Sequence, residues 1–287
     1  DMESYIYFEE LEGLVKEGKV KLTDIDDSVR RILKVKHELG LFDDPYRYLD
    51  EAREKEVTSS KDMMDGVLDM AKKSIVLLKN EDKILPLKKK GQSIALIGPL
   101  AADKNSPLGN WRIGADDNTA ISVLEGLQAY RGNDIKHQQG VKLLNKIPVG
   151  FHEEVSINET DRTGFAAAKK AAARADVIVM VLGEYGFQSG EGRSRANLDL
   201  PGLQQELLEE IYAVNPNIVL VLMNGRPLIL NWASEHLPAI VEAWHLGTQS
   251  GNAIAQVLYG DYNPGGKLTM SFPRNVGQMP LYYNIKS

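Results

Sequence analysis

The sequence predicts an α/β fold, in which a mainly parallel sheet carries helices on both of its faces. The first observation is a set of short, uncharged runs rich in Val, Ile and Leu, such as Val177–Leu182. These runs do not alternate with polar residues, which is typical of strands buried on both faces. The second observation is that segments of helical periodicity separate the runs, and this strand–helix alternation favours parallel pairing. We therefore expect an α/β sandwich of the flavodoxin-like kind.

The predicted elements follow from these two patterns. Strands are expected at residues 93–97, 177–182, 218–223, 240–244 and 267–272. Helices are expected at residues 62–77, 121–130, 163–175, 203–214 and 251–259. The long connections at residues 105–120 and 140–160 attract interest, because long loops in compact domains are often functional.

The first 48 residues lack this strand–helix alternation and instead show two helical patterns. Residues 5–17 place apolar side chains on one helical face, and a second such helix begins at Thr23-Asp24 and ends before Gly40. Two short amphipathic helices cannot form a core alone, so their apolar faces need a partner. Residues 45–58 are polar and rich in charge, which predicts a linker.

Composition excludes several classes of protein. The net charge of −6 leaves no basic surplus for phosphates, so nucleic acid is not expected as a partner. The chain has no cysteine, which excludes disulfides and thiolate metal sites. No apolar run is long enough to span a membrane. The chain begins at Asp1 without a signal peptide, and we expect it to be a piece of a longer protein.

The loop Leu182–Arg195 is the main candidate for chemistry, because it follows a buried strand and contains four glycines, two carboxylates and two arginines. The carboxyl ends of parallel strands are where α/β proteins place ligands. Glu191 lies between two glycines, so a tight turn can present its carboxyl group as a proton donor. The alternative is a solvated residue paired with Arg193 or Arg195. Glu184, at the strand end, either binds a ligand or pairs with an arginine.

Other residues carry weaker signals. Trp111 lies in a loop rich in Gly, Asn and Asp, where its ring either stacks on a sugar or covers a core edge. Trp244 is expected in the core, Trp232 in helix packing, and His245 as a packed or hydrogen-bonded histidine. The turn Asn224-Gly-Arg-Pro227 supports the strand order more than any chemistry. No phosphate-loop motif, G-x-S-x-G motif or metal-ligand spacing of histidines occurs.

Several segments, in order along nearly the whole chain, resemble glycoside hydrolase family 3, most closely its bacterial periplasmic β-glucosidases. These segments are Arg30–Leu33, Lys36–Tyr46, Ser74–Asn80, Leu85–Leu87, Ile94–Ala101, Gly109–Trp111, Leu222–Leu228, Gly247–Ala255, Gly260–Leu268 and Ser271–Arg274. The resemblance implies that residues 1–48 are the last helices of a (β/α)8-like barrel. Residues 49–61 are then a linker, and residues 62–287 form the α/β sandwich domain that follows.

The same resemblance implies roles for individual residues. Members of the family look like retaining hydrolases with an Asp nucleophile on the barrel, in a Ser-Asp-Trp-type motif that this chain lacks. The acid/base carboxylate comes from the loop matched by Ser189–Gly192, which assigns it to Glu191, with Glu184 as the second candidate. Trp111, Met2, Arg193, Arg195 and Tyr185 are candidates for contacts with the sugar.

The resemblance thus predicts part of an exo-acting β-glucosidase that removes terminal β-D-glucosyl residues, without a cofactor. The expected partners are a β-glucoside or oligosaccharide and the missing barrel, in a periplasmic or secreted protein. Because the nucleophile is absent, we expect the chain alone to be inactive. The alternatives are a non-catalytic carbohydrate-binding or regulatory module, and a flavodoxin-like nucleotide or flavin binder that lacks a phosphate loop.

Overall fold

The computed structural model describes residues 3–58, 60–112, 114–148, 153–282 and 284. The chain divides into two compact units, Asp1–Ser60 and Lys61–Ser287. The assignment of the first unit to the end of a barrel stays a prediction. None of the described helices is long and apolar enough to cross a membrane.

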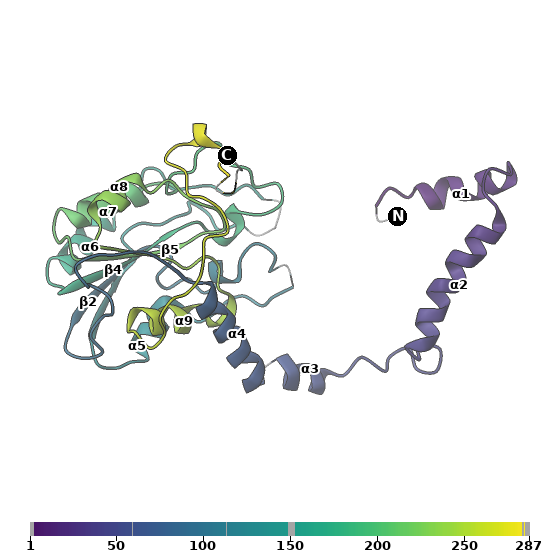
Figure 1. Cartoon of the computed structure of the whole chain (residues 1–287), viewed down its shortest axis with the longest axis horizontal. Helices are drawn as coiled ribbons and strands as arrows, with labels where there is room; N and C mark the ends of the chain where they lie inside the picture. Colours follow the sequence, from purple (N-terminus) through teal and green to yellow (C-terminus); the bar gives the residue numbers. More distant parts are fainter. Residues whose placement is uncertain (1–2, 59, 113, 149–152, 283, 285–287) are drawn as a thin grey trace. The chain divides into compact units, whose positions relative to one another are not determined.

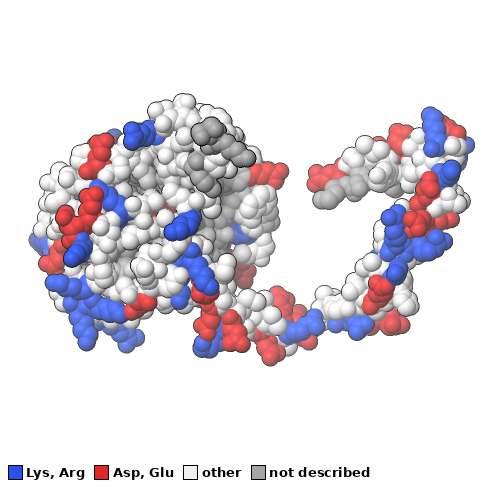
Figure 2. All heavy atoms as spheres, viewed as in Figure 1, with Lys and Arg blue, Asp and Glu red and all other residues white. Residues whose placement is uncertain are grey.

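The first unit contains three helices, α1 (Ile6–Lys16), α2 (Leu22–Glu38) and α3 (Glu51–Thr58). The first two confirm the helices predicted there. Neither contains a buried residue, and Phe8 and Ile32 are 86% and 60% exposed. Acidic and basic side chains are mixed along the surface of this unit (Figure 2). The segment expected to be a polar linker instead forms α3 over most of its length, since Glu and Lys favour helix as well as solvent.

The second unit confirms the predicted α/β sandwich. Its six-stranded sheet has the order β1-β6-β5-β4-β2-β3, and only β1 runs antiparallel to its neighbour. The strands are β1 (Val76–Asn80), β2 (Ser93–Ile97), β3 (Asp134–Gln138), β4 (Val177–Gly183), β5 (Ile218–Met223) and β6 (Ala239–Glu242). When the five parallel strands β2 to β6 are renumbered 1 to 5 along the chain, their order across the sheet, read from β3, is 2-1-3-4-5. This is the order of flavodoxin-like sheets.

Helices cover both faces of the sheet (Figure 1). One face packs against α4 (Lys61–Ser74), α5 (Val123–Gln128) and α9 (Ser250–Leu258). The other packs against α6 (Phe165–Ala172), α7 (Gln204–Tyr212) and α8 (Asn231–His236). In β4, Val179 faces the first layer and Met180 the second. Both faces are therefore buried, which explains why β4 and β5 contain no polar residues.

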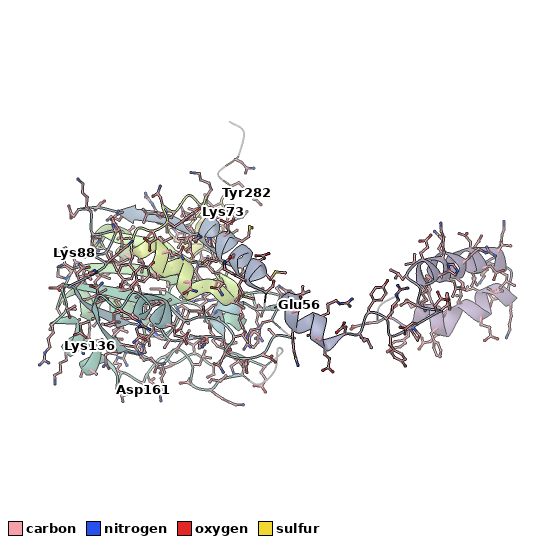
Figure 3. The ribbon with its side chains drawn as sticks, turned by 90° about the horizontal axis from the view of Figure 1, so that it is seen from below. Glu56, Lys73, Lys88, Lys136, Asp161 and Tyr282 are labelled. Carbon is pink, nitrogen blue, oxygen red and sulfur yellow. The ribbon has the colours of Figure 1, made fainter. Side chains whose placement is uncertain are left out.

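Two strands escape sequence-based prediction. No Gly or Pro separates α4 from the apolar run of β1, so the sequence predicts a helix that continues to residue 77. In the structure the helix ends at Ser74 and the strand begins at Val76. Strand β3 is polar because it lies at the edge of the sheet. There Lys136 points outward (Figure 3). Charged edge residues are a common protection against unwanted strand pairing.

Two predictions at the other end of the sheet were wrong. Residues 267–272 form no strand, because β1 already occupies the edge beside β6. Strand β6 ends at Glu242, two residues earlier than expected. The Glu242 carboxyl group accepts a hydrogen bond from the main-chain N–H of Trp244 (2.8 Å), and Trp244 adopts a positive φ of 54°. Trp244 is consequently half-buried in a loop, 6.1 Å from the ring of Phe272, rather than in the core.

Candidate active site

The strand order locates the candidate site. In flavodoxin-like sheets, ligands bind outside the carboxyl ends of the strands where the strand order reverses, here between β2 and β4. The loop after β2 contains the short helix η1 (Ser106–Leu108) and Trp111, and the loop after β4 contains η2 (Gly186–Gln188) and Glu191. The two loops are joined directly, because the N–H of Gly186 donates to Oγ of Ser106 (3.1 Å).

Glu191 lies at the exposed tip of the second loop. Its neighbours Gly190 and Gly192 have φ values of +118° and +68°, which glycine adopts without strain. A Cβ atom on Gly190 would lie 1.9 Å from Nδ2 of Asn110, so the loop also packs closely on the neighbouring segment. Among the residues that the structure describes, Glu191 forms no ion pair. Of the expected alternative, a solvated residue paired with Arg193 or Arg195, the structure shows the solvated position, whereas Arg195 pairs with Glu184.

Glu184 has the opposite environment, because its carboxylate is completely buried. Oε1 lies 2.7 Å from Nη1 of Arg195 and 3.0 Å from Nε of Arg226, and Oε2 accepts from the N–H of Gly225 (3.2 Å). Of the two readings left open by the sequence, pairing with arginine is therefore the one the structure shows.

Arg226 is a residue whose importance the sequence did not reveal. It belongs to the Asn224-Gly-Arg-Pro227 turn after β5, which brings its guanidinium beneath the loop that contains Glu191. Its Nη2 atom donates to the main-chain oxygens of Gln188 and Arg193, the latter at 2.8 Å. The available signal was the position of this turn at the carboxyl end of a strand.

A second buried carboxyl group, Glu242, lies at the end of β6. Burial raises its pKa to about 8, and the nearby charge of Glu184 acts in the same direction. Hydrogen bonds from Trp244 N–H and from Nδ2 of Asn224 (3.2 Å) oppose the increase. His245 is half-buried with its Nε2 atom enclosed, and desolvation lowers the pKa of its ring. As predicted, it is a packed histidine.

The remaining aromatic candidates differ in accessibility. Trp111 is 64% exposed, so its ring is available for stacking. Tyr185 is 8% exposed and meets Phe187 edge to face at 5.8 Å; it also lines a cavity of about 560 Å³ beside the ends of β2 and β3. Trp232 packs between helices as expected, with its ring 5.3 Å from that of Tyr212. Met2 lies outside the described residues, and the role of each candidate in sugar binding stays a prediction.

The described residues contain no group of three or more His, Asp or Glu side chains that could hold a metal ion. The candidate site contains one exposed carboxyl group on a glycine-flanked turn, an exposed tryptophan, and a buried polar layer. Residues 75–287 match the model of the glycosyl hydrolase family 3 C-terminal domain.

The chain belongs to glycosyl hydrolase family 3. It is 40% identical to the periplasmic beta-glucosidase of Salmonella typhimurium over 289 aligned positions, which cover 97% of this chain and 38% of that protein. It is 39% identical to a beta-xylosidase of Formosa agariphila, covering 90% of this chain and 35% of the relative.

Solved structures show the same relationship. The beta-glucosidase of Listeria innocua, crystallised with isofagomine, superposes with a TM-score of 0.84 at 34% identity. The match covers 98% of this chain and 37% of that one. The chain thus spans less than two fifths of the length of these relatives, as the resemblance in its sequence led us to expect.

Proposed function

We propose that this chain is the C-terminal part of a retaining, exo-acting β-glucosidase, and that Glu191 is its acid/base. The observation that carries the proposal is the presentation of Glu191 on an exposed turn at the switch point of the sheet. A proton donor must reach the leaving oxygen of its substrate, which requires such accessibility. Glu184, buried between two guanidinium groups, cannot meet this requirement without leaving both of them unpaired.

In the proposed mechanism the two carboxyl groups come from different parts of the enzyme. An Asp on the barrel attacks the anomeric carbon and forms a glycosyl-enzyme, while protonated Glu191 donates its proton to the departing oxygen. Glu191 then accepts a proton from the water that attacks the glycosyl-enzyme, which releases glucose and restores both groups. Trp111, at the same edge of the sheet, would stack on the apolar face of a sugar ring.

The sequence indicates where the proposed nucleophile lies. The chain contains no Ser-Asp-Trp motif, so we place the proposed nucleophile on the barrel. The relatives are long enough to contain such a barrel in addition to the part that matches this chain. The exposed apolar side chains of α1 and α2, including Phe8 and Ile32, support the assignment of residues 1–48 to the end of that barrel. On this assignment residues 49–61 connect the parts, and residues 62–287 are the sandwich domain.

The relatives also support a location and a substrate. The Salmonella relative is a periplasmic beta-glucosidase and the Formosa relative a beta-xylosidase, and both names describe glycoside hydrolases. We therefore propose a periplasmic or secreted enzyme that acts on β-glucosides. The relative rates on β-glucosides and β-xylosides would show which sugar is preferred.

The test compares an aryl β-glucoside assay of this chain alone with the same assay after the barrel has been added. We expect no Glu191-dependent turnover by the chain alone, and activity when the barrel is present. Glu191→Gln should lower kcat/KM for a substrate with a poor leaving group by about 10²- to 10⁴-fold. The control is Glu235→Gln, which changes an exposed glutamate on α8 and should leave activity unchanged.

Two results would contradict the proposal. Equal activity of the wild type and Glu191→Gln would show that Glu191 is not the acid/base. Sugar binding without turnover, in a verified complex with the barrel, would instead support a non-catalytic carbohydrate-binding module.

A further inference from the structure

The loop that contains Glu191 has few internal contacts that could fix its conformation. Residues 189–192 are Ser-Gly-Glu-Gly, a sequence without apolar side chains, and both glycines have positive φ. Within the loop, the N–H of Arg193 donates to the oxygen of Gly190 (3.2 Å), which closes a single turn. Contacts from other segments must therefore fix where the Glu191 carboxyl group points.

Arg226 makes two such contacts with one atom. Its Nη2 donates to the main-chain oxygen of Gln188 on one side of the turn and to that of Arg193 on the other. The two oxygens bracket the four residues that contain Glu191, so a single guanidinium holds both ends of the turn together.

Glu184 in turn orients the guanidinium. Its Oε1 lies 3.0 Å from Nε of Arg226 and forms an ion pair with the same guanidinium whose Nη2 binds the loop. The same oxygen pairs with Arg195, whose Nη2 donates to the main-chain oxygen of Asp199 (2.9 Å) beyond the loop. A planar guanidinium with a fixed set of donors can serve both partners at once, which a lysine ammonium on a flexible stem cannot.

Burying these charges costs free energy, so a contribution to stability does not by itself account for the ion pairs of Glu184. Removing an ion pair from water is expensive, and apolar replacements of buried pairs are often as stable or more so. The pair is found beneath the turn that presents Glu191, where a shift of about 1 Å can lower a rate by about 100-fold.

We propose that Arg226, oriented by Glu184, is a positioning residue that sets the direction of the Glu191 carboxyl group. This inference rests on the proposed function of Glu191. It gives the two glutamates of the loop different tasks: Glu191 transfers the proton, and Glu184 holds the arginine that holds the turn.

The experiment uses the enzyme with its barrel present and compares Arg226→Lys with Arg174→Lys, which changes an exposed arginine after α6. Two substrates distinguish proton donation from folding. Phenyl β-glucoside releases a phenol with a pKa of about 10 and needs the proton. 2,4-Dinitrophenyl β-glucoside releases a stable phenolate and does not.

We expect Arg226→Lys to lower kcat/KM for the phenyl substrate by about 10- to 100-fold, with a loss below about 3-fold for the dinitrophenyl substrate. Glu184→Gln is the second variant, in case Arg226→Lys folds poorly, and should show the same dependence on the leaving group. Arg174→Lys should match the wild type on both substrates. In the chain by itself, Arg226→Lys should speed amide hydrogen exchange in residues 189–193.

Equal losses on both substrates, or wild-type rates for both variants, would overturn the positioning role. The failure of the proposed function gives a different pattern. If Glu191→Gln shows no dependence on the leaving group, Glu191 is not the acid and both proposals fall. If Glu191→Gln shows it and the Arg226 and Glu184 variants do not, only the positioning role falls.

Discussion

Glu242 allows a prediction about stability that does not depend on catalysis. Its carboxyl group is completely buried at the end of β6, and burial raises its pKa from 4.5 to about 8. The substitution Glu242→Gln keeps the shape of the protonated side chain but removes its ability to ionise. The pH dependence of the difference between the two proteins therefore isolates this one group.

The sign and size follow from linkage between protonation and folding. Between pH 4.5 and 8 the folded protein keeps a proton on Glu242 that the unfolded chain has released. The stabilisation by this proton is complete below pH 4.5 and is lost as the pH rises to about 8. A pKa difference of about 3.5 corresponds to about 5 kcal/mol, or about 1.4 kcal/mol for each pH unit within this window.

The assay is urea unfolding of both proteins at pH values from 5.5 to 7.5. Trp111, Trp232 and Trp244 all belong to the unit Lys61–Ser287, so tryptophan fluorescence reports the unfolding of that unit. Across this range the free energy of unfolding of Glu242→Gln should rise relative to the wild type by roughly 2 to 3 kcal/mol. Val241→Ala is the control, because it changes the adjacent strand residue without removing an ionisable group.

A pH-independent difference between Glu242→Gln and the wild type would refute the reasoning. It would mean that Glu242 carries the same charge in the folded and unfolded states throughout the range. A wild type that gains stability over the variant toward pH 7.5 would refute it more directly, since the pKa would then be lowered by folding.

Two further substitutions test local geometry. Gly190→Ala places a Cβ against Asn110 at a φ of +118° and should lower kcat/KM for phenyl β-glucoside by at least about 10-fold with the barrel present. Gly192→Ala, at a φ of +68° with open space around it, should lose less; equal losses would contradict the role of the Asn110 contact. Ser122→Ala removes the cap of α5, where Oγ accepts from the N–H of Glu125 (3.2 Å), and should cost about 1 kcal/mol in urea unfolding. An unchanged urea midpoint would show that the cap contributes nothing.

The sequence predicted the central strands well and the edges poorly, for a physical reason. Strands β2, β4 and β5 are buried on both faces, so nearly every residue in them must be apolar and the pattern is visible without a structure. An edge strand such as β3 satisfies half of its backbone groups with solvent and needs no such pattern. Residues 267–272 have a suitable pattern but no free edge to pair with, which only the full sheet reveals.

The candidate site divides in the same way. The exposed turn at Glu191 was predictable, because two glycines around a carboxyl group after a buried strand are a local signature, whereas its role as acid/base comes from the family resemblance and stays a prediction. Arg226 was not, since its partners Glu184, Gln188 and Arg193 are more than 30 positions away in the sequence. Nothing in the order of residues indicates that an arginine after β5 reaches under the loop after β4.

The sequence alone determined the fold class, the family and the loop that presents Glu191, because these depend on periodicity, local turn chemistry and contiguous motifs. The tertiary structure alone decided the strand order, the separate environments of Glu184 and Glu191, and the contacts of Arg226. Those depend on which strands lie side by side, and thus on long-range packing that the burial of both sheet faces selects.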